Sequence, residues 1–204
     1  MNVEAPAHGL ARVLKSLNCD RAYGLSLLAA CALLWVPEIG GDAWRNALSY
    51  DRAGLAQGEW WRVLTGHFVH MNPEHALLNG LGLILMWALF ARDFSPIRWL
   101  AIYLASCLAI SAGLWLRNPQ VIWYVGASGA LHGVMAAGTV AHLRRRDLDR
   151  WILAGFIIAK LSYEQFAGSM PFAGAINTVV DAHLYGALGG LVAALFLRSR
   201  SELP

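Results

Sequence analysis

Four residues in this sequence could together catalyse acyl transfer, and each lies in or beside a strongly apolar stretch. Ser128 belongs to a Gly-Ala-Ser-Gly run, His183 stands near the start of the last apolar stretch, and His75 and Asn79 share an earlier one. Polar groups in hydrocarbon are costly unless they are paired, so by default they mark function. A serine can act as nucleophile, a histidine as its base, and a histidine–asparagine pair as oxyanion donors. These residue types therefore indicate proteolysis inside a membrane.

All four residues are predicted to lie at a similar depth. At a rise of ~1.5 Å per helical residue, Ser128 lies about 24 Å, and His183 about 22 Å, from the basic residue at the far end of its segment. The same count gives about 25 Å for His75 and about 20 Å for Asn79. In a hydrocarbon core about 30 Å thick, they share one layer below the outer surface. Three separate segments thus bring reactive groups to one height, which favours a single site.

Small residues follow the serine and the last histidine at a regular spacing. Gly129 and Gly133 are four residues apart, and Gly186 and Gly190 repeat that spacing. Faces of this kind let two membrane helices approach backbone to backbone. We therefore expect the two helices to cross there and to bring the serine hydroxyl within hydrogen-bonding reach of the histidine ring.

The composition places these residues in an integral membrane protein. The chain has 204 residues, of which 57% are hydrophobic and 14% are charged, whereas soluble domains carry about 25% charged residues. The basic residues gather at segment ends and not on one face, so the net charge of +3 does not indicate nucleic-acid binding. The three cysteines have no metal-binding spacing, and their positions disfavour a disulfide framework. We expect one domain over residues 1–204, embedded in the lipid bilayer, with no metal, no cofactor and no nucleic acid.

Six apolar stretches are expected to form the helices that position the four residues. They cover residues 22–36, 75–91, 97–116, 129–143, 151–167 and 179–197. Several are shorter than the ~20 residues of a full crossing, so tilting or local thinning of the bilayer has to make up the difference. The first follows basic residues, as a secretory signal would, but it lacks the usual cleavage site and is interpreted as an uncleaved helix. The predicted fold is an all-α, polytopic membrane protein with a bundle of six transmembrane helices.

Charge at the segment ends predicts the orientation. With a cytoplasmic N-terminus, eleven of the 16 basic residues fall on the inside, four fall on the outside, and Lys160 lies within the fifth stretch. The eleven are Arg12, Lys15, Arg21, Arg92, Arg98, Arg144, Arg145, Arg146, Arg150, Arg198 and Arg200. This bias predicts that both termini are cytoplasmic, with residues 1–21 inside and a first loop at residues 37–74 outside.

The sequence resembles the rhomboid family in four motifs that occur in the family's order. They are EWWRVLT at residues 59–65 with the Phe68 and His70 that follow, HALLN at 75–79, GASG at 126–129 and AHLYGALGG at 182–190. The resemblance implies a six-helix intramembrane serine protease with a Ser128–His183 catalytic dyad. It also implies that His75, Asn79 and the backbone amide of Ser128 bind the oxyanion. The residues at supporting positions are Gly126, Gly129, His132, Gly186 and Gly190.

Two further runs are similar to the rhombosortase branch of this family. They are WYVGASGALHG around the serine and KLSYEQ in the fifth apolar stretch. The resemblance implies a protease of the bacterial inner membrane, with its first loop in the periplasm. Its substrates would be single-pass membrane proteins whose C-terminal sorting signal has a Gly-Gly motif, an apolar helix and a basic tail. Cleavage would fall near the periplasmic end of that helix.

Three other functions stay open. One is a general rhomboid protease with different clients. Another is a rhomboid-like scaffold without activity, although the intact serine, histidine and oxyanion pair argue against it. The third is a small transporter or channel, for which an internal repeat or a pair of interrupted helices would be expected, and the sequence has neither.

Several titratable residues near the dyad allow more than one interpretation. His132 stands four residues after the serine, where many rhomboids have Tyr or Phe, and it is a second candidate for the base or for a partner of the base. Asp181 is two residues from the last histidine, and side chains at that spacing do not face one another on a helix. We therefore expect a lone dyad, with Asp181 in a first helical turn where a carboxylate suits the dipole. His67 and His70, taken with His75, lack the spacing of a zinc motif.

The fifth stretch contains the pair Lys160 and Glu164. Their i,i+4 spacing places both on one face of a helix, where they can pair. Such a pair either faces the helix bundle or its water-filled mouth, or extends toward the interface near the outer end of the helix. The sequence does not separate the two interpretations.

Overall fold

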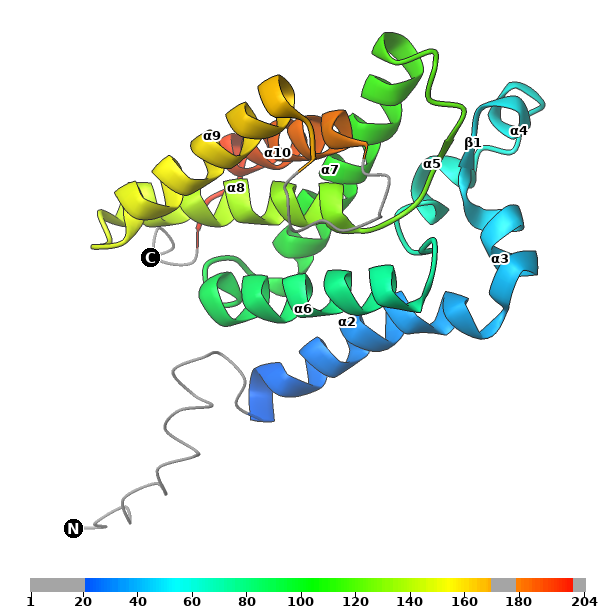
Figure 1. The fold of residues 1–204 in the computed structure, drawn as a ribbon. Coiled ribbons are helices and arrows are strands. Elements are labelled where there is room, and N and C mark those ends of the chain that lie inside the picture. The colour runs from blue at the N-terminus through cyan, green and yellow to red at the C-terminus, as the bar shows by residue number, and fades with distance from the viewer. Residues whose placement is uncertain (1–20, 170–178, 200–204) are drawn as a thin grey trace.

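The described part of the chain folds mostly into helices, with one small two-stranded sheet (Figure 1). The computed structural model describes residues 21–169 and 179–199. In chain order the elements are α2 (Arg21–Ile39), α3 (Gly41–Leu48), β1 (Tyr50–Asp51), α4 (Arg52–Ala56), α5 (Arg62–Thr65), α6 (Pro73–Phe90), α7 (Pro96–Arg117), β2 (Trp123–Tyr124), α8 (Ser128–Arg145), α9 (Arg150–Ala167) and α10 (Val180–Phe196). The elements α3, β1, α4 and α5 of the first loop gather at one end of the longer helices in Figure 1.

Each of the six predicted apolar stretches corresponds to one long helix: α2, α6, α7, α8, α9 or α10. Within the described residues, α6 and α7 are long and apolar enough to cross a membrane. Helices α2 and α3 together form a third candidate span, bent by 107° at the break between them. The mostly helical membrane architecture is confirmed, whereas the count of six crossings stays a prediction. Residues 1–20, which make up nearly all of the predicted cytoplasmic segment, lie outside the described residues.

The helix that contains His75 and Asn79 begins at a defined cap. Asn72 precedes Pro73, the first residue of α6, and its side chain accepts a hydrogen bond from the backbone N–H of His75 at 2.8 Å. Asparagine is a favoured N-cap residue, and proline suits the first helical position because its φ is already helical. The cap therefore fixes where α6 starts, and it places Asn79 one turn beyond His75 on the same face.

Helices α8 and α10 cross at the two predicted glycine pairs. A Cβ atom at Gly186 would collide with the backbone of Gly129, and one at Gly190 would collide with the backbone of Gly133. Two helix backbones come this close only where both present small residues. The expected crossing is thus present, and it brings the first turn of α10 beside the first turn of α8.

A buried arginine holds the first loop together. Arg62 forms an ion pair with Glu59, and its Nη1 donates to the carbonyl oxygens of Asn46 and Ser49, both at 2.8 Å. A guanidinium has five donors in a fixed geometry, so one side chain can tie several carbonyl groups. The EWWRVLT run therefore orders the loop around β1.

The small sheet connects this loop to the serine. β1 pairs antiparallel with β2, with Tyr50 opposite Tyr124. Both tyrosines are buried in one apolar cluster with Ile110 and Leu114 of α7. The hydroxyl of Tyr124 also donates to the carbonyl oxygen of Gly126 at 3.0 Å, two residues before the serine. The polypeptide that leads into α8 is therefore held at a fixed place.

Candidate active site

The serine and the last histidine meet where α8 and α10 begin. Ser128 is the first residue of α8, and its Oγ lies 3.0 Å from Nε2 of His183, in the first turn of α10. The imidazole is buried, with 6% of the residue exposed. This contact has the length and the atoms of a hydrogen bond between a nucleophile and its base.

A glycine makes room for this arrangement two residues before the serine. Gly126 has φ +114°, a backbone conformation that residues with a side chain rarely adopt. A Cβ atom at this position would also lie 2.7 Å from Cε1 of His75. Gly126 therefore permits both the turn into α8 and the close approach of the His75 ring.

The two predicted oxyanion donors lie at the same cavity as the serine. The backbone N–H of Met71 lies 3.5 Å from Nδ1 of His75, an arrangement that assigns the ring hydrogen to Nε2 and leaves Nε2–H as a donor. The side-chain nitrogen of Asn79 donates to the carbonyl oxygen of His75 at 2.8 Å. Because an amide nitrogen has two hydrogens, Asn79 keeps a second one for another acceptor.

These groups line a mostly apolar cavity of about 430 Å³. Its polar lining is His75, Asn79, Ser128, His132, Lys160 and His183. The rest of the wall is largely apolar and includes Leu78, Leu85, Leu131, Met135 and Phe156. This volume, with a few polar groups in an apolar wall, is typical of a small binding site.

The second candidate base has a different contact. Nδ1 of His132 lies 2.7 Å from the carbonyl oxygen of Ser128, so it carries the hydrogen and donates to that oxygen. The ring stacks on His183, with centroids 4.1 Å apart and planes inclined by 15°. His132 thus contacts the face of the neighbouring imidazole, while His183 contacts the serine hydroxyl. The geometry favours His183 as the group that accepts the serine proton.

A buried carboxylate lies on the far side of the histidine, a contact that the predicted dyad did not include. Nδ1 of His183 is 2.9 Å from Oε2 of Glu164, and Nζ of Lys160 is 2.6 Å from Oε1 of the same carboxylate. Glu164 is 3% exposed, so the pair faces the helix bundle and does not extend to the interface. The sequence revealed the pair by its i,i+4 spacing but not the helix that it faces.

The carboxylate nearest in sequence to the histidine has another partner. Asp181 lies in the first turn of α10, as expected, and its Oδ2 accepts from the side-chain nitrogen of Asn118 at 2.5 Å. Asn118 follows α7, so the contact ties the start of α10 to the end of that helix. Asp181 is therefore a packing contact and not a partner of the imidazole.

The three ligand-type side chains at the site are poorly arranged for a metal. Ligand atoms of His132, Glu164 and His183 lie within 4.8 Å of one another. However, the stacked rings of the two histidines direct their in-plane lone pairs almost in parallel. One ion cannot lie in both ring planes at bonding distance, because the tetrahedral zinc sites of proteins need converging ligands.

The first-loop histidines are buried packing groups. His67 and His70 are fully buried, and burial lowers the pKa of each to about 4. Nε2 of His67 lies 3.2 Å from Oγ of Ser111, which connects the loop to α7. Both rings are therefore neutral at physiological pH.

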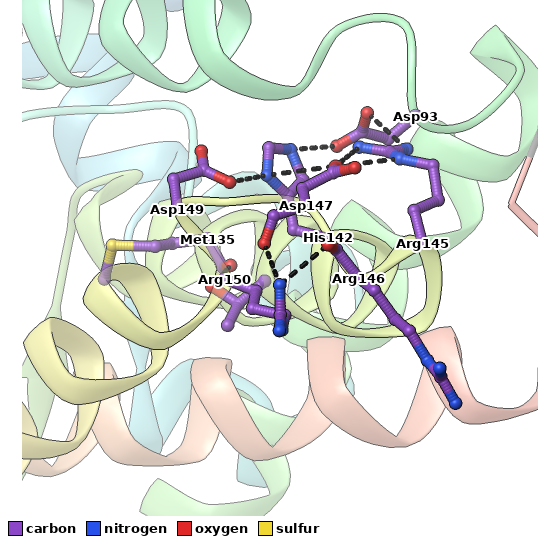
Figure 2. A network of polar contacts seen from close by, with 9 residues as sticks. Asp93, Met135, His142, Arg145, Arg146, Asp147, Asp149 and Arg150 are labelled. Carbon is purple, nitrogen blue, oxygen red and sulfur yellow. Dashed lines mark hydrogen bonds and ion pairs between the residues drawn. The ribbon is translucent and has the colours of Figure 1, made fainter.

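The other end of α8 has a separate network of charged groups (Figure 2). Nδ1 of His142 lies 2.8 Å from Asp149, and Nε2 lies 3.2 Å from Asp93. Arg145 pairs with Asp93 at 2.9 Å and with Asp147 at 2.7 Å. These contacts join the segment after α6 to the connection between α8 and α9. The hydrogen bond from His142 lowers the pKa of Asp149.

Comparison with known proteins gives the family. Residues 57–200 match the rhomboid domain family. The chain is 30% identical over 182 residues to the putative rhomboid protease YdcA of Bacillus subtilis (strain 168), which covers 86% of this chain and 88% of that protein. It is 30% identical over 150 residues to the rhomboid protease GluP of the same organism, or 74% of this chain and 28% of GluP. It is also 31% identical over 144 residues to the rhomboid-like protein 11, chloroplastic, of Arabidopsis thaliana, or 65% of this chain and 51% of that protein.

A mostly helical membrane fold with a partly buried serine–histidine contact defines the class of protein. The family match covers more than half of the chain, so this protein belongs to the rhomboid family. That membership supports intramembrane proteolysis as the general activity and places the protein in a membrane.

Proposed function

We propose that this protein is an intramembrane serine endopeptidase in which Ser128 is the nucleophile and His183 is the general base. The observation that carries the proposal is the 3.0 Å contact between Oγ and Nε2 at the wall of the apolar cavity. Oγ attacks the carbonyl carbon of the client peptide bond, and its proton passes to Nε2. The imidazolium then gives that proton to the leaving amine, and water releases the acyl group by the reverse steps.

The developing negative charge on the client carbonyl oxygen needs donors. The backbone N–H of Ser128 is one, because the first residue of a helix has no acceptor for its N–H within that helix. The side-chain amide of Asn79 and Nε2–H of His75 are the other two, and both side chains line the same cavity. Donors fixed in an apolar site stabilise such charge strongly because they need no reorganisation during the reaction.

The proposed clients are single-spanning membrane proteins that unwind near the outer end of their helix. A cavity below the membrane surface accepts a peptide bond only if the client backbone is extended there. Freeing backbone groups in lipid is costly, and glycine lowers helix propensity by ~1 kcal/mol per residue relative to Ala. Glycine also lets the client backbone approach Ser128 closely.

Within this class we propose a rhombosortase, which cleaves a Gly-Gly sorting signal of exported proteins. The runs WYVGASGALHG and KLSYEQ support it. The protein would then lie in the inner membrane of a bacterium, with both termini in the cytoplasm and the cavity open to the periplasmic side. The alternative is a general rhomboid protease with other clients, which the similarity to YdcA and GluP supports.

The clients are tested with the full chain reconstituted in liposomes and three single-spanning reporters. The first has Gly-Gly at the outer end of its helix and a basic tail. The second replaces Gly-Gly with Leu-Leu, and the matched control exchanges two residues in the middle of the helix. We expect cleavage of the first and the control, mapped to the Gly-Gly site by mass spectrometry, and little cleavage of the second. If the Leu-Leu reporter is cut as fast as the first, the Gly-Gly signal is not what selects the client.

A further inference from the structure

We infer that Glu164 positions the catalytic histidine, so that the site works as a Ser–His–Glu triad, with Lys160 holding the carboxylate. This inference rests on the proposed function of Ser128 and His183. It concerns a residue of α9, while the serine and the histidine belong to α8 and α10. The site would therefore depend on the relative positions of three helices.

Both oxygens of the carboxylate are engaged inside the protein. Oε2 of Glu164 faces Nδ1 of His183 at 2.9 Å, and Oε1 faces Nζ of Lys160 at 2.6 Å. The residue is 3% exposed, and a buried carboxylate is retained only where it is paired and hydrogen-bonded. The lysine lies one helical turn before Glu164, where it neutralises the charge and fixes the direction of the side chain.

The carboxylate determines which nitrogen of the imidazole holds the hydrogen. An ionised carboxylate accepts hydrogen bonds and cannot donate them, so Nδ1 carries the hydrogen. The lone pair of the neutral ring is then on Nε2, directed at the serine hydroxyl 3.0 Å away. A ring in the opposite tautomer could not take the serine proton. Glu164 therefore selects the form of the base that the reaction needs and stabilises the imidazolium that forms.

A second contact limits the rotation of the same ring. His132 stacks on its face at 4.1 Å, while Glu164 holds its edge. The ring is thus restrained in two directions by residues of α8 and α9. Packing alone fixes the plane of the ring, but only the carboxylate distinguishes one nitrogen from the other.

The cavity gives a way to separate positioning from client binding. Lys160 lines the cavity, but Glu164 is not among the lining residues. A change at Glu164 should therefore act on the chemical step and leave the affinity for the client nearly unchanged. A change at Lys160 acts on both, because its side chain lies where the client binds.

The test compares Glu164→Gln with Asp149→Asn in the full-length reconstituted protein. Each replaces a carboxylate that contacts a histidine, at opposite ends of α8, by the matching amide. The readouts are cleavage of the Gly-Gly reporter and the rate of labelling by a fluorophosphonate probe. In that labelling the Oγ–P bond forms, the P–F bond breaks, fluoride leaves and the serine proton passes to Nε2.

We expect Glu164→Gln to lower kcat on the order of 10²–10⁴-fold, the range for loss of a general-base function, with KM nearly unchanged. Labelling should slow in parallel, while Asp149→Asn keeps both rates. Glu164→Asp, which retains the charge, should be faster than Glu164→Gln. Wild-type kcat in Glu164→Gln, while Ser128→Ala is inactive, would overturn the positioning role and leave the protease assignment intact. Activity of Ser128→Ala would instead overturn the protease assignment.

Chemical rescue separates a positioning role from a structural one. Glu164→Ala leaves a space beside Nδ1 of His183 that formate can fill, and added formate should restore part of the labelling rate. Formate should not speed up His183→Ala, which has no ring to orient. If formate has no effect on Glu164→Ala and Glu164→Asp is as slow as Glu164→Gln, the carboxylate serves only the packing of α9, and the inference is wrong.

Discussion

A histidine–carboxylate contact lies at each end of helix α8. The two contacts differ in the partner of the second imidazole nitrogen. Near its first residue, His183 has Glu164 at Nδ1 and the hydroxyl of Ser128 at Nε2. Near its last turn, His142 has Asp149 at Nδ1 and Asp93 at Nε2. A ring between a carboxylate and a hydroxyl can take a proton from the hydroxyl. A ring between two carboxylates is fixed as a bridge, because both partners only accept.

The surroundings of the two histidine–carboxylate contacts also differ, because those of the first are mostly apolar and those of the second are charged. The first lies at an apolar cavity with two further donors, His75 and Asn79. The second lies among Arg145, Asp147 and other charged groups that pair with one another (Figure 2). A histidine–carboxylate pair is therefore no sign of catalysis by itself. Two features separate the regions. At the first, one imidazole nitrogen contacts a nucleophile, and a cavity beside it can hold a substrate.

The largest expected effect tests that separation directly. Ser128→Ala and His183→Ala should each abolish cleavage of the reporter, since losing either member of such a unit costs on the order of 10⁶-fold in kcat. His142→Ala should leave cleavage close to wild type, because its ring has no contact with a nucleophile. Membrane insertion and expression are measured alongside for all three. Loss of activity in His132→Ala but not in His183→Ala would reassign the base to His132.

A smaller effect is expected at the oxyanion donors. His75→Ala and Asn79→Ala should each lower kcat by about 10²–10³-fold, the usual effect of removing one donor. Labelling of Ser128 by the fluorophosphonate probe should slow but persist, because the nucleophile and its base remain. Wild-type turnover in both variants would mean that this face of α6 only packs.

The sequence predicted the parts of the site that depend on spacing along one chain segment. The two glycine pairs indicated the crossing of α8 and α10, and with it the approach of Ser128 to His183. Residue Glu164 shows where this reasoning stops. Its i,i+4 spacing to Lys160 predicted the pair, but the rotation of α9 about its own axis depends on packing between helices that no single segment encodes.

The hydrogen bonds that order the first loop could not be predicted from the sequence, for a related reason. The EWWRVLT run resembled a family signature, but its buried Arg62 binds the carbonyl groups of Asn46 and Ser49, which have no distinctive sequence of their own. Backbone carbonyls are the same in every residue, so a side chain that binds them has no partner visible in the sequence. The same holds for Tyr124 and the carbonyl oxygen of Gly126.

A third prediction concerns the helix crossing that positions the first region. In Gly186→Ala the new methyl group would meet the backbone of Gly129, which cannot move aside as a side chain would. Overpacking of this kind costs about 1–3 kcal/mol, so both the thermal midpoint and kcat should fall. The matched control is Gly155→Ala in α9, where a Cβ atom has nothing within 4 Å. The control should be neutral or slightly stabilising, since Ala favours helix over Gly. Equal midpoints in the two variants would show that the crossing tolerates a methyl group.

The smallest expected effect belongs to the charged network around His142 and concerns the stability of the fold alone. Contact with His142 lowers the pKa of Asp149 below its ordinary value of 3.8. A carboxylate whose pKa is lower in the folded state stabilises the fold above its unfolded pKa, and this contribution disappears as pH falls through the folded value. The side chain of Asp149 is 45% exposed, so solvent screens the pair and the contribution should be below about 1 kcal/mol. We therefore expect Asp149→Asn to lower the thermal midpoint slightly between pH 5 and 7. The difference from wild type should begin to shrink as pH falls below 3.8 and should vanish once pH is below the lower pKa of the folded state. Calorimetry of both proteins in the same detergent over this range measures the difference. A gap that widened toward low pH would contradict the expected sign, because protonation of Asp149 removes the charge that the histidine contact stabilises.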